Sequence, residues 1–487
     1  YHLALPKLYL INHRIFPTPH NVYSGVPFNT EMLYAVGLAL GGESLATLIP
    51  WGLSIAILYA IAVWARRFAD GQVGLIAALL FYSCPMVAIA TWFGLVELNW
   101  CFFNLLAVLA LLIWLERSAH FGPLWFMVIG VFAGLAGGVK YNALTILGGI
   151  PALLLWTRIR RQGRDWTQWA PEAGLFLLAA LVAVSPWLLK NQVFYHNPIF
   201  PLFNEFFTGA SGGPDWQGLL QDANARNLRA TFTTWRGFTD LFSVPWSKEW
   251  EGSGMHSTGI ALLLFIPWLF FARKRSGQEA PSVYQSLSWI LAFNWATWGL
   301  SSRLPRFFIF SIPLLAILLA MSLLSRSGGA GFRRSIAWVV ILACIPNCCL
   351  IFNYWFKLGG WKVVLGQESR SEYLLHGKPG YFTPYYAAAQ FVNEELPKNS
   401  RILFFEESRG YYFERDFVAT SFFAPNPFVA FVNQSTKPGQ LRDYLTKEGI
   451  THVFLNRAEM FRRGGKSPFS KEGALIFDAF AGRYLRK

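Results

Sequence analysis

The stretch GLAGGVKYNAL (134–144) decides how often this chain crosses a membrane. It lies inside an apolar run from residue 122 to 157. That run is too long for a single spanning helix, which needs about 20 residues. Gly137, Gly138 and Lys140 interrupt it with residues that favour a turn over a continuous apolar helix. The sequence therefore predicts two helices joined by a tight turn.

The other apolar runs are easier to separate. Read with a window of about 19 residues, the chain gives ten candidate spans. They lie at 45–65, 72–91, 98–115, 122–138, 142–157, 172–188, 257–271, 285–300, 307–323 and 335–352. The 487 residues are 54% hydrophobic and only 14% charged, whereas soluble domains carry about 25% charged residues. The predicted fold class is a polytopic α-helical membrane protein.

The net charge of +15 does not indicate a nucleic-acid partner, because the basic residues form short clusters between the apolar runs. With ten spans, these clusters fall on one face of the membrane. Their members are Arg66, Arg67, Arg117, Arg158, Arg160, Arg161, Arg164, Arg273, Lys274, Arg275, Arg326, Arg333 and Arg334. Positively charged loops remain in the cytoplasm. We therefore expect the visible N-terminus and the C-terminal region on the outer face.

The predicted outer face carries long segments, at 1–44 and 189–256, whereas the inner loops are short. Long loops are where function concentrates. We expect two domains: 1–352 in the membrane and 353–487 outside it.

The outer C-terminal region has the pattern of a small α/β domain with a parallel sheet. Helices are predicted at 383–396 and 438–449, and strands at 401–407 and 451–456. Since no phosphate-binding glycine loop is found in it, this domain is expected to serve recognition or scaffolding rather than catalysis.

Four basic residues lie at predicted outer helix ends, against the inside bias: Lys140, Lys190, Arg303 and Arg306. One interpretation is that their long side chains reach lipid headgroups. The other is that they bind a lipid-linked phosphate, since arginine presents a planar fork that matches phosphate oxygens. In the second interpretation, Arg303 and Arg306 with Pro305 between them form a rigid clamp.

An acidic residue has a comparable position. Glu97 begins the predicted span 98–115 on the outer side, with aromatic residues around it. It is either a solvated carboxylate favoured by the helix dipole or a metal ligand or acid–base group facing a cavity. Glu31 and Glu43 raise the same question with a weaker pattern.

The first residues have the pattern of a helix that lies along the outer membrane surface and ends near Pro17. His2 and Lys7 are among its polar residues, and we include both as candidate phosphate-binding residues.

Several motifs in order resemble those of a known family. They are YHLALPKLYL (1–10), PFNTEMLY (27–34), GLVELNWCFF (94–103), GLAGGVKYNAL (134–144), SPWLLKNQVFYHNPIFPLFN (185–204) and RLPRFFIFSIPLLAILLA (303–320). Together they resemble the multi-pass GT-C glycosyltransferases, in the bacterial branch related to protein O-mannosyltransferases and lipid A aminoarabinose transferases.

The resemblance implies a polyprenyl-phosphate sugar donor, an acceptor that is a protein, lipid or glycan, and a place in the bacterial cytoplasmic membrane among its lipids. It implies a catalytic Asp a few residues before the YHL motif, which we expect to lie upstream of Tyr1 in a part that this sequence lacks. Glu97 matches the family's second outer-loop acid, and Lys140, Arg303 and Arg306 match basic positions near the lipid phosphate.

The implied chemistry needs a carboxylate to accept a proton and cations to hold the charge that develops on the leaving phosphate. A single direct displacement would invert the anomeric carbon. A divalent metal ion held in part by Glu97 could assist, and no organic cofactor is expected. The main rival is a transporter or flippase of lipid-linked saccharides. Such proteins more often consist of two matched halves with broken helices, and we find no matched halves in this sequence.

Overall fold

The computed structural model describes residues 2–18, 21–117, 121–162, 166–208, 229–246, 255–271, 283–301, 303–325, 329–420, 426–462 and 468–486. Two parts of the predicted outer loop 189–256, and the predicted inner-face residues Arg164, Arg273, Lys274, Arg275 and Arg326, lie outside these ranges.

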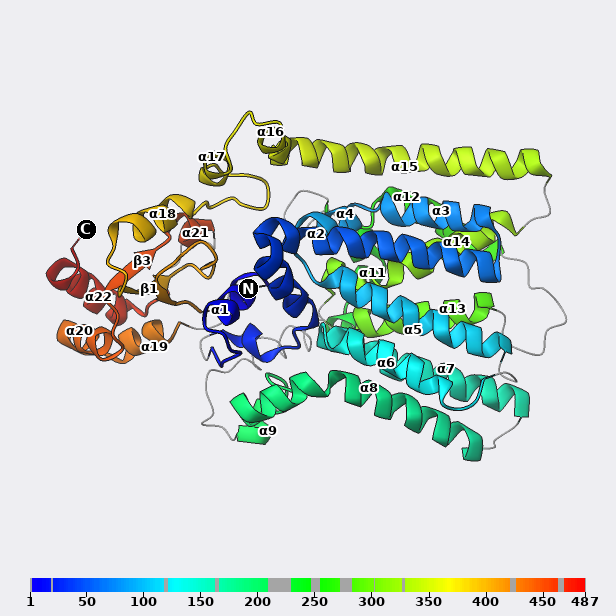
Figure 1. Cartoon of the computed structure of the whole chain (residues 1–487), viewed down its shortest axis with the longest axis horizontal. Helices are drawn as coiled ribbons and strands as arrows, with labels where there is room; N and C mark the ends of the chain where they lie inside the picture. Colours follow the sequence, from blue (N-terminus) through cyan, green and yellow to red (C-terminus); the bar gives the residue numbers. More distant parts are fainter. Residues whose placement is uncertain are drawn as a thin grey trace.

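The first 358 residues form a bundle of apolar helices (Figure 1). Its elements are α2 (Asn29–Phe68), α3 (Gly71–Tyr82), α4 (Pro85–Trp92), α5 (Glu97–Arg117), α6 (Trp125–Gly137), η3 (Tyr141–Leu144), α7 (Thr145–Gln162), α8 (Trp166–Tyr195), α12 (Ile260–Phe265), η5 (Ile266–Phe271), α13 (Val283–Gly299), η6 (Pro305–Phe308), α14 (Ser311–Leu324) and α15 (Ala330–Leu358). Short elements precede or interrupt them: α1 (Ala4–Ile11), η1 (Val22–Gly25), α9 (Asn204–Thr208), α11 (Trp235–Ser243) and η4 (Val244–Trp246).

Each of the ten predicted spans coincides with a helix or with a pair of consecutive helices, and the break at 134–144 is confirmed. Within the described residues, four helices are long and apolar enough to cross a membrane alone, and the bent pair α3 and α4 makes five. Other apolar helices of the bundle are shorter, with 10 to 17 residues; α6 and α14 are examples. The apolar helices indicate a membrane-inserted protein.

The prediction of a single helix over 72–91 is wrong, because this span consists of two helices. The chain breaks after Tyr82, and α4 leaves α3 at an angle of 68°. Pro85 is the first residue of α4 and has no N–H to continue the hydrogen bonding of α3. A hydropathy window cannot detect this bend because both halves are equally apolar.

The first span is longer than predicted. Helix α2 begins at Asn29, sixteen residues before the predicted start at 45, and contains a kink at Gly41 and Gly42. Gly42 has φ of +67°, a conformation that glycine adopts without steric cost.

Helices α6 and α8 pack closely because small residues line their contact. A Cβ at Gly130 would overlap the carbonyl of Phe176, and a Cβ at Gly134 would overlap the carbonyl of Ala180. Small residues four apart let two membrane helices approach to backbone contact. This contact fixes the end of α6, from which the turn at 138–140 begins.

The C-terminal region forms the predicted small α/β domain. Helices α16 (Gly360–Val364) and α17 (Arg370–Leu375) lead into it from α15, which runs through the expected boundary at 352. The domain contains α18 (Tyr386–Glu395), β1 (Arg401–Phe405), β2 (Asp416–Val418), α19 (Pro427–Gln434), α20 (Pro438–Lys447), β3 (His452–Leu455), α21 (Arg457–Arg462) and α22 (Lys471–Tyr484).

The three strands are parallel and lie in the order β2-β1-β3, which confirms the parallel sheet. Because strand side chains alternate, β1 contributes to two cores. Leu403 and Phe405 pack with α19, α20 and α22, whereas Ile402 and Phe404 pack on the side of α18.

The N-terminal helix was predicted to end near Pro17, but α1 ends at Ile11. Its Leu5 and Tyr9 are buried against Phe28 and Trp187, so α1 is held by α2 and α8.

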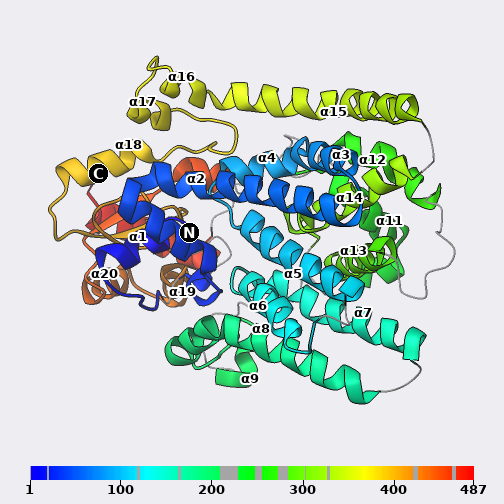
Figure 2. The same ribbon diagram turned by 45° about the vertical axis from the view of Figure 1, so that its right-hand side comes forward.

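The C-terminal domain lies beside α1 at one end of the bundle, whereas α2 ends and α15 begins at the other (Figures 1 and 2). Lys7 of α1 donates to the carbonyl of Tyr411 over 2.7 Å. Glu43 of α2 pairs with Arg370 and accepts a hydrogen bond from the Tyr412 hydroxyl. These contacts tie the domain to α1 and to the kink of α2.

We predict that Gly134→Val lowers the apparent unfolding free energy by about 1–3 kcal/mol, the usual cost of overpacking, because the new side chain meets the backbone of α8. Gly52→Val is the matched control, since a Cβ at Gly52 meets no atom within 4 Å. Thermal unfolding in detergent measures both. Equal melting temperatures for the two variants would contradict the close packing of α6 and α8.

Candidate functional site

Glu97 is the first residue of α5, and its side chain is only 1% exposed. Its Oε2 accepts the backbone N–H of Val96 at 3.1 Å. Two contacts with α2 fix this helix start: the Tyr34 hydroxyl donates to the carbonyl of Leu95 over 2.6 Å, and Asn99 donates to the Thr30 hydroxyl over 2.8 Å. A carboxylate this deeply buried needs hydrogen-bond donors or opposite charges close to it.

Lys140 supplies the first cation from the turn between α6 and η3. Its Nζ lies 3.3 Å from Glu97 Oε1. The turn approaches the start of α2 closely, because Asn29 donates its backbone N–H to the carbonyl of Gly138 over 2.8 Å. A Cβ at Gly138 would overlap the Asn29 side chain. Glycine at 138 therefore permits the approach that brings Lys140 to α5.

Arg306 supplies the second cation from η6. Its Nε lies 3.6 Å from the same Glu97 oxygen, and its side chain is 42% exposed. The neighbouring ring of Phe307 packs on Trp100 of α5, with Lys140 Nζ at 4.0 Å and the Arg306 guanidinium at 5.4 Å from its centre. The ring face stabilises both cations. Sequence reasoning missed Phe307, although an aromatic residue directly after a candidate arginine is a usable signal.

The structure thus brings together three of the predicted site residues, Glu97, Lys140 and Arg306, from three separate connections of the bundle. Two cations share one carboxylate, so the three groups in contact carry a net charge of +1. Arg306 is the more exposed of the two cations. An excess of positive charge with a partly exposed guanidinium is suited to binding an anion such as a phosphate.

His2 forms a second pair beside this cluster. Its Nδ1 lies 2.6 Å from Oε1 of Glu31, a side chain that is 1% exposed in the first turn of α2. Burial lowers the pKa of His2 below its ordinary value of 6.5, while the Glu31 carboxylate acts in the opposite direction. The net direction favours the neutral imidazole. The sequence signal for Glu31 is weak: it is a single acid in PFNTEMLY (27–34).

The two clamp arginines have different partners. Arg303 is buried and donates from Nε to the carbonyl of Gly299 over 2.6 Å and from Nη1 to the carbonyl of Gly237 over 2.8 Å. Its φ of +52° is uncommon for a residue with a side chain. Arg303 therefore ties the end of α13 to α11, whereas Arg306 contacts Glu97.

Lys190 and Lys7 also bond to carbonyl groups. Lys190 donates to Ser24 and Val26 over 2.6 and 3.1 Å, between the rings of Phe28 and Trp187. Lys7 contacts the C-terminal domain, as described above, and burial lowers its pKa. Both lysines join segments that are far apart in the chain.

The side chains around Glu97 do not fit a metal-binding site. Among the described residues, no group of three or more His, Cys, Asp or Glu side chains is placed to hold one. One oxygen of Glu97 already faces two cations, which would repel a divalent ion there.

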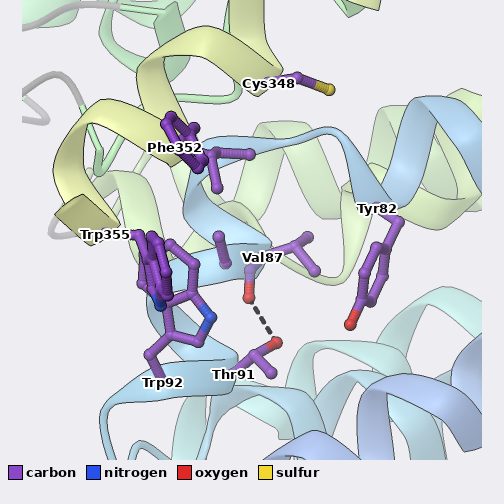
Figure 3. A pocket seen from close by; sticks show the side chains of 9 residues that line it. Tyr82, Val87, Thr91, Trp92, Cys348, Phe352 and Trp355 are labelled. Carbon is purple, nitrogen blue, oxygen red and sulfur yellow. Dashed lines mark hydrogen bonds between the residues drawn. The ribbon is translucent and has the colours of Figure 1, made fainter. Parts of the chain in front are cut away.

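A cavity of about 430 Å³ lies between α4 and α15 (Figure 3). Its walls are mainly apolar, and the Thr91 hydroxyl in it donates to the carbonyl of Val87. Trp92 and Trp355 lie together at one side, and Tyr82 lies at another. This lining is suited to hydrocarbon and offers nothing to bind a sugar phosphate.

Comparison with solved structures identifies the architecture. One crystal structure of ArnT from Cupriavidus metallidurans, in the apo state, matches with a TM-score of 0.54 and 16% identity, over 85% of this chain and 79% of ArnT. A second, bound to undecaprenyl phosphate, matches with a TM-score of 0.54 and 14% identity, over 98% of this chain and 89% of ArnT. The chain has the fold of ArnT.

This result confirms the predicted GT-C-like fold with a small α/β domain. At such low identity the likeness to ArnT concerns the fold. No protein-family model matches the sequence, and the curated proteins yield no match.

We predict that Glu97→Gln lowers the apparent unfolding free energy by about 3 kcal/mol, because it leaves the partly buried Lys140 without its counter-charge. Adding Lys140→Met to that variant should recover part of the loss, since the uncompensated cation is then removed. SDS titration of the unaltered protein, Glu97→Gln, Lys140→Met and the double variant gives the coupling energy. Losses that simply add would show that Glu97 and Lys140 do not interact.

Proposed function

We propose that this chain is an integral membrane glycosyltransferase of the bacterial cytoplasmic membrane. It moves a sugar from a polyprenyl-phosphate donor to an acceptor on the outer face. The observation that carries the proposal is the convergence of Lys140 and Arg306 on buried Glu97 beside Phe307. The shared fold supports it, because ArnT has been crystallised with undecaprenyl phosphate.

In the proposed reaction, Lys140 and Arg306 bind the phosphate that links the sugar to the prenyl chain. As the bond from the anomeric carbon to the phosphate oxygen lengthens, negative charge grows on the phosphate and positive charge on the sugar ring. Cations fixed before the reaction stabilise the leaving phosphate without reorganisation. Glu97 holds both cations in place, since its Oε1 is their common partner.

A single displacement by an acceptor hydroxyl or amine would invert the anomeric carbon. The reaction would take place at the end of the bundle where the C-terminal domain contacts α1 through Lys7 and Tyr411. That domain would then stand over the acceptor side of the site. The two lysines and Arg303 that bond to carbonyls would maintain the outer segments around it.

We predict that Arg306→Ala reduces sugar transfer about 10²–10³-fold, the usual effect of removing one group that stabilises developing charge, with little loss of stability because the side chain is half exposed. Arg334→Ala, an exposed arginine on α15, is the matched control. Arg303→Ala should instead lower the melting temperature, since it removes two hydrogen bonds to buried backbone.

The assay incubates purified full-length protein with undecaprenyl phosphate carrying tritiated mannose, glucose or arabinose, together with extracted envelope material. New labelled glycoconjugate distinguishes a transferase from a flippase, which forms no glycosidic bond. Full transfer by Arg306→Ala would contradict the proposed phosphate site.

A further inference from the structure

The proposed transfer makes no use of the cavity between α4 and α15, whose volume is about 430 Å³. None of the nine residues that line it carries a charge, and the proposed phosphate ligands Lys140 and Arg306 are not among them. The hydroxyl of Thr91 is already engaged, since it donates to the carbonyl of Val87 over 2.7 Å. The cavity is therefore suited to an apolar ligand.

The bend between α3 and α4 accounts for the cavity. The two helices meet at 68°, and α15 packs beside both of them. A bent pair and a single long helix cannot remain in contact along their whole length. One face of α4, within 87–92, and one face of α15, within 348–355, line the gap that results (Figure 3).

The cavity is continuous with the surface of α15 that faces the bilayer. Its wall on α4 is buried, with Val87 and Thr91 only 1% and 5% exposed. On α15, Phe352 and Trp355 are 63% and 39% exposed. Only 17% of the apolar 18-residue window of α15 is buried inside the protein. Lipid chains therefore surround the open side of the cavity.

Water is a poor occupant of such a space. A cavity with apolar walls stays dry, because a water molecule needs two or more polar partners. An empty cavity is also unfavourable, since the atoms that line it lose their dispersion contacts. A hydrocarbon chain from the bilayer restores these contacts without burying a polar group.

Two tryptophans indicate how such a chain would be oriented. Trp92 is the last residue of α4, and Trp355 lies close to the end of α15 at Leu358. Tryptophan concentrates at the interface between the membrane and water. Cys348, at the other end of the α15 wall, is about 10 Å from Trp355 along the helix. The cavity thus runs from the interface into the hydrocarbon layer.

We propose that this cavity binds one acyl chain of a membrane phospholipid, whose headgroup lies beside Trp92 and Trp355. Acyl chains form most of the hydrocarbon around α15, whereas the prenyl carrier requires a cation for its phosphate and the lining residues supply none. The bound chain fills the gap between α4 and α15. It also supports the segment from Trp92 to Glu97 that leads into α5. This inference does not depend on the proposed function.

The test uses the full-length protein in a steroid-based detergent, which has no alkyl chain to compete. The probe is phosphatidylethanolamine with a photoactivatable diazirine in one acyl chain, and mass spectrometry identifies the cross-linked peptides. The label should concentrate in 82–92 and 348–355. An excess of unlabelled phosphatidylethanolamine should remove it, whereas undecaprenol at the same concentration should not.

Ala88→Leu and Cys348→Trp narrow the cavity from its two walls, so a folding defect in one variant leaves the other informative. Both should lose most of the label that unlabelled lipid displaces. Cys349→Trp is the matched control and should keep it. Cys348 and Cys349 are both exposed, but only Cys348 is among the residues that line the cavity.

Full labelling of both narrowed variants, or an equal loss in Cys349→Trp, would overturn the inference. Displacement of the label by undecaprenol would also contradict it, because the prenyl chain would then be the occupant. Since no step of this experiment measures sugar transfer, a failure of the proposed function would leave its outcome unchanged.

Discussion

A buried carboxylate at the start of α5 is the constraint on which the site depends. Glu97 is 1% exposed, and the cost of burying its charge is offset by the two cations beside it. Neither cation lies near Glu97 in sequence. Lys140 comes from the turn after α6, and Arg306 comes from η6, before α14. The ion pairs therefore join three connections of the bundle at a single oxygen.

Glycine and proline residues around the site make this convergence of charges possible. Gly130 and Gly134 allow α6 to lie against α8, and Gly138 allows the following turn to meet Asn29 at the start of α2. Pro305 begins η6, which carries Arg306 and Phe307 to the first turn of α5. Each of these residues sets a backbone path, and the charges are brought together as a consequence.

Much of the fold was predictable from the sequence, since apolar content alone locates membrane helices and alternating elements indicate a parallel sheet. The bend between α3 and α4 was not, because hydropathy records composition and not direction. The sequence predicted that Glu97, Lys140 and Arg306 lie on the same face of the membrane. It did not predict that the two cations contact Glu97. Arg303 and Arg306 are three residues apart, and the positive φ of Arg303 belongs to a backbone that directs it to Gly299 and Gly237. No sequence pattern separates the two arginines.

The central claim is that the cations around Glu97 bind the phosphate of a prenyl carrier. Equilibrium binding of undecaprenyl phosphate and of undecaprenol to the purified full-length protein tests it most directly. The account predicts that the phosphate form binds at least tenfold more tightly, about 1.4 kcal/mol, and that Arg306→Ala removes most of this preference. Equal binding of the two lipids, or a preference that Arg306→Ala leaves unchanged, would contradict it.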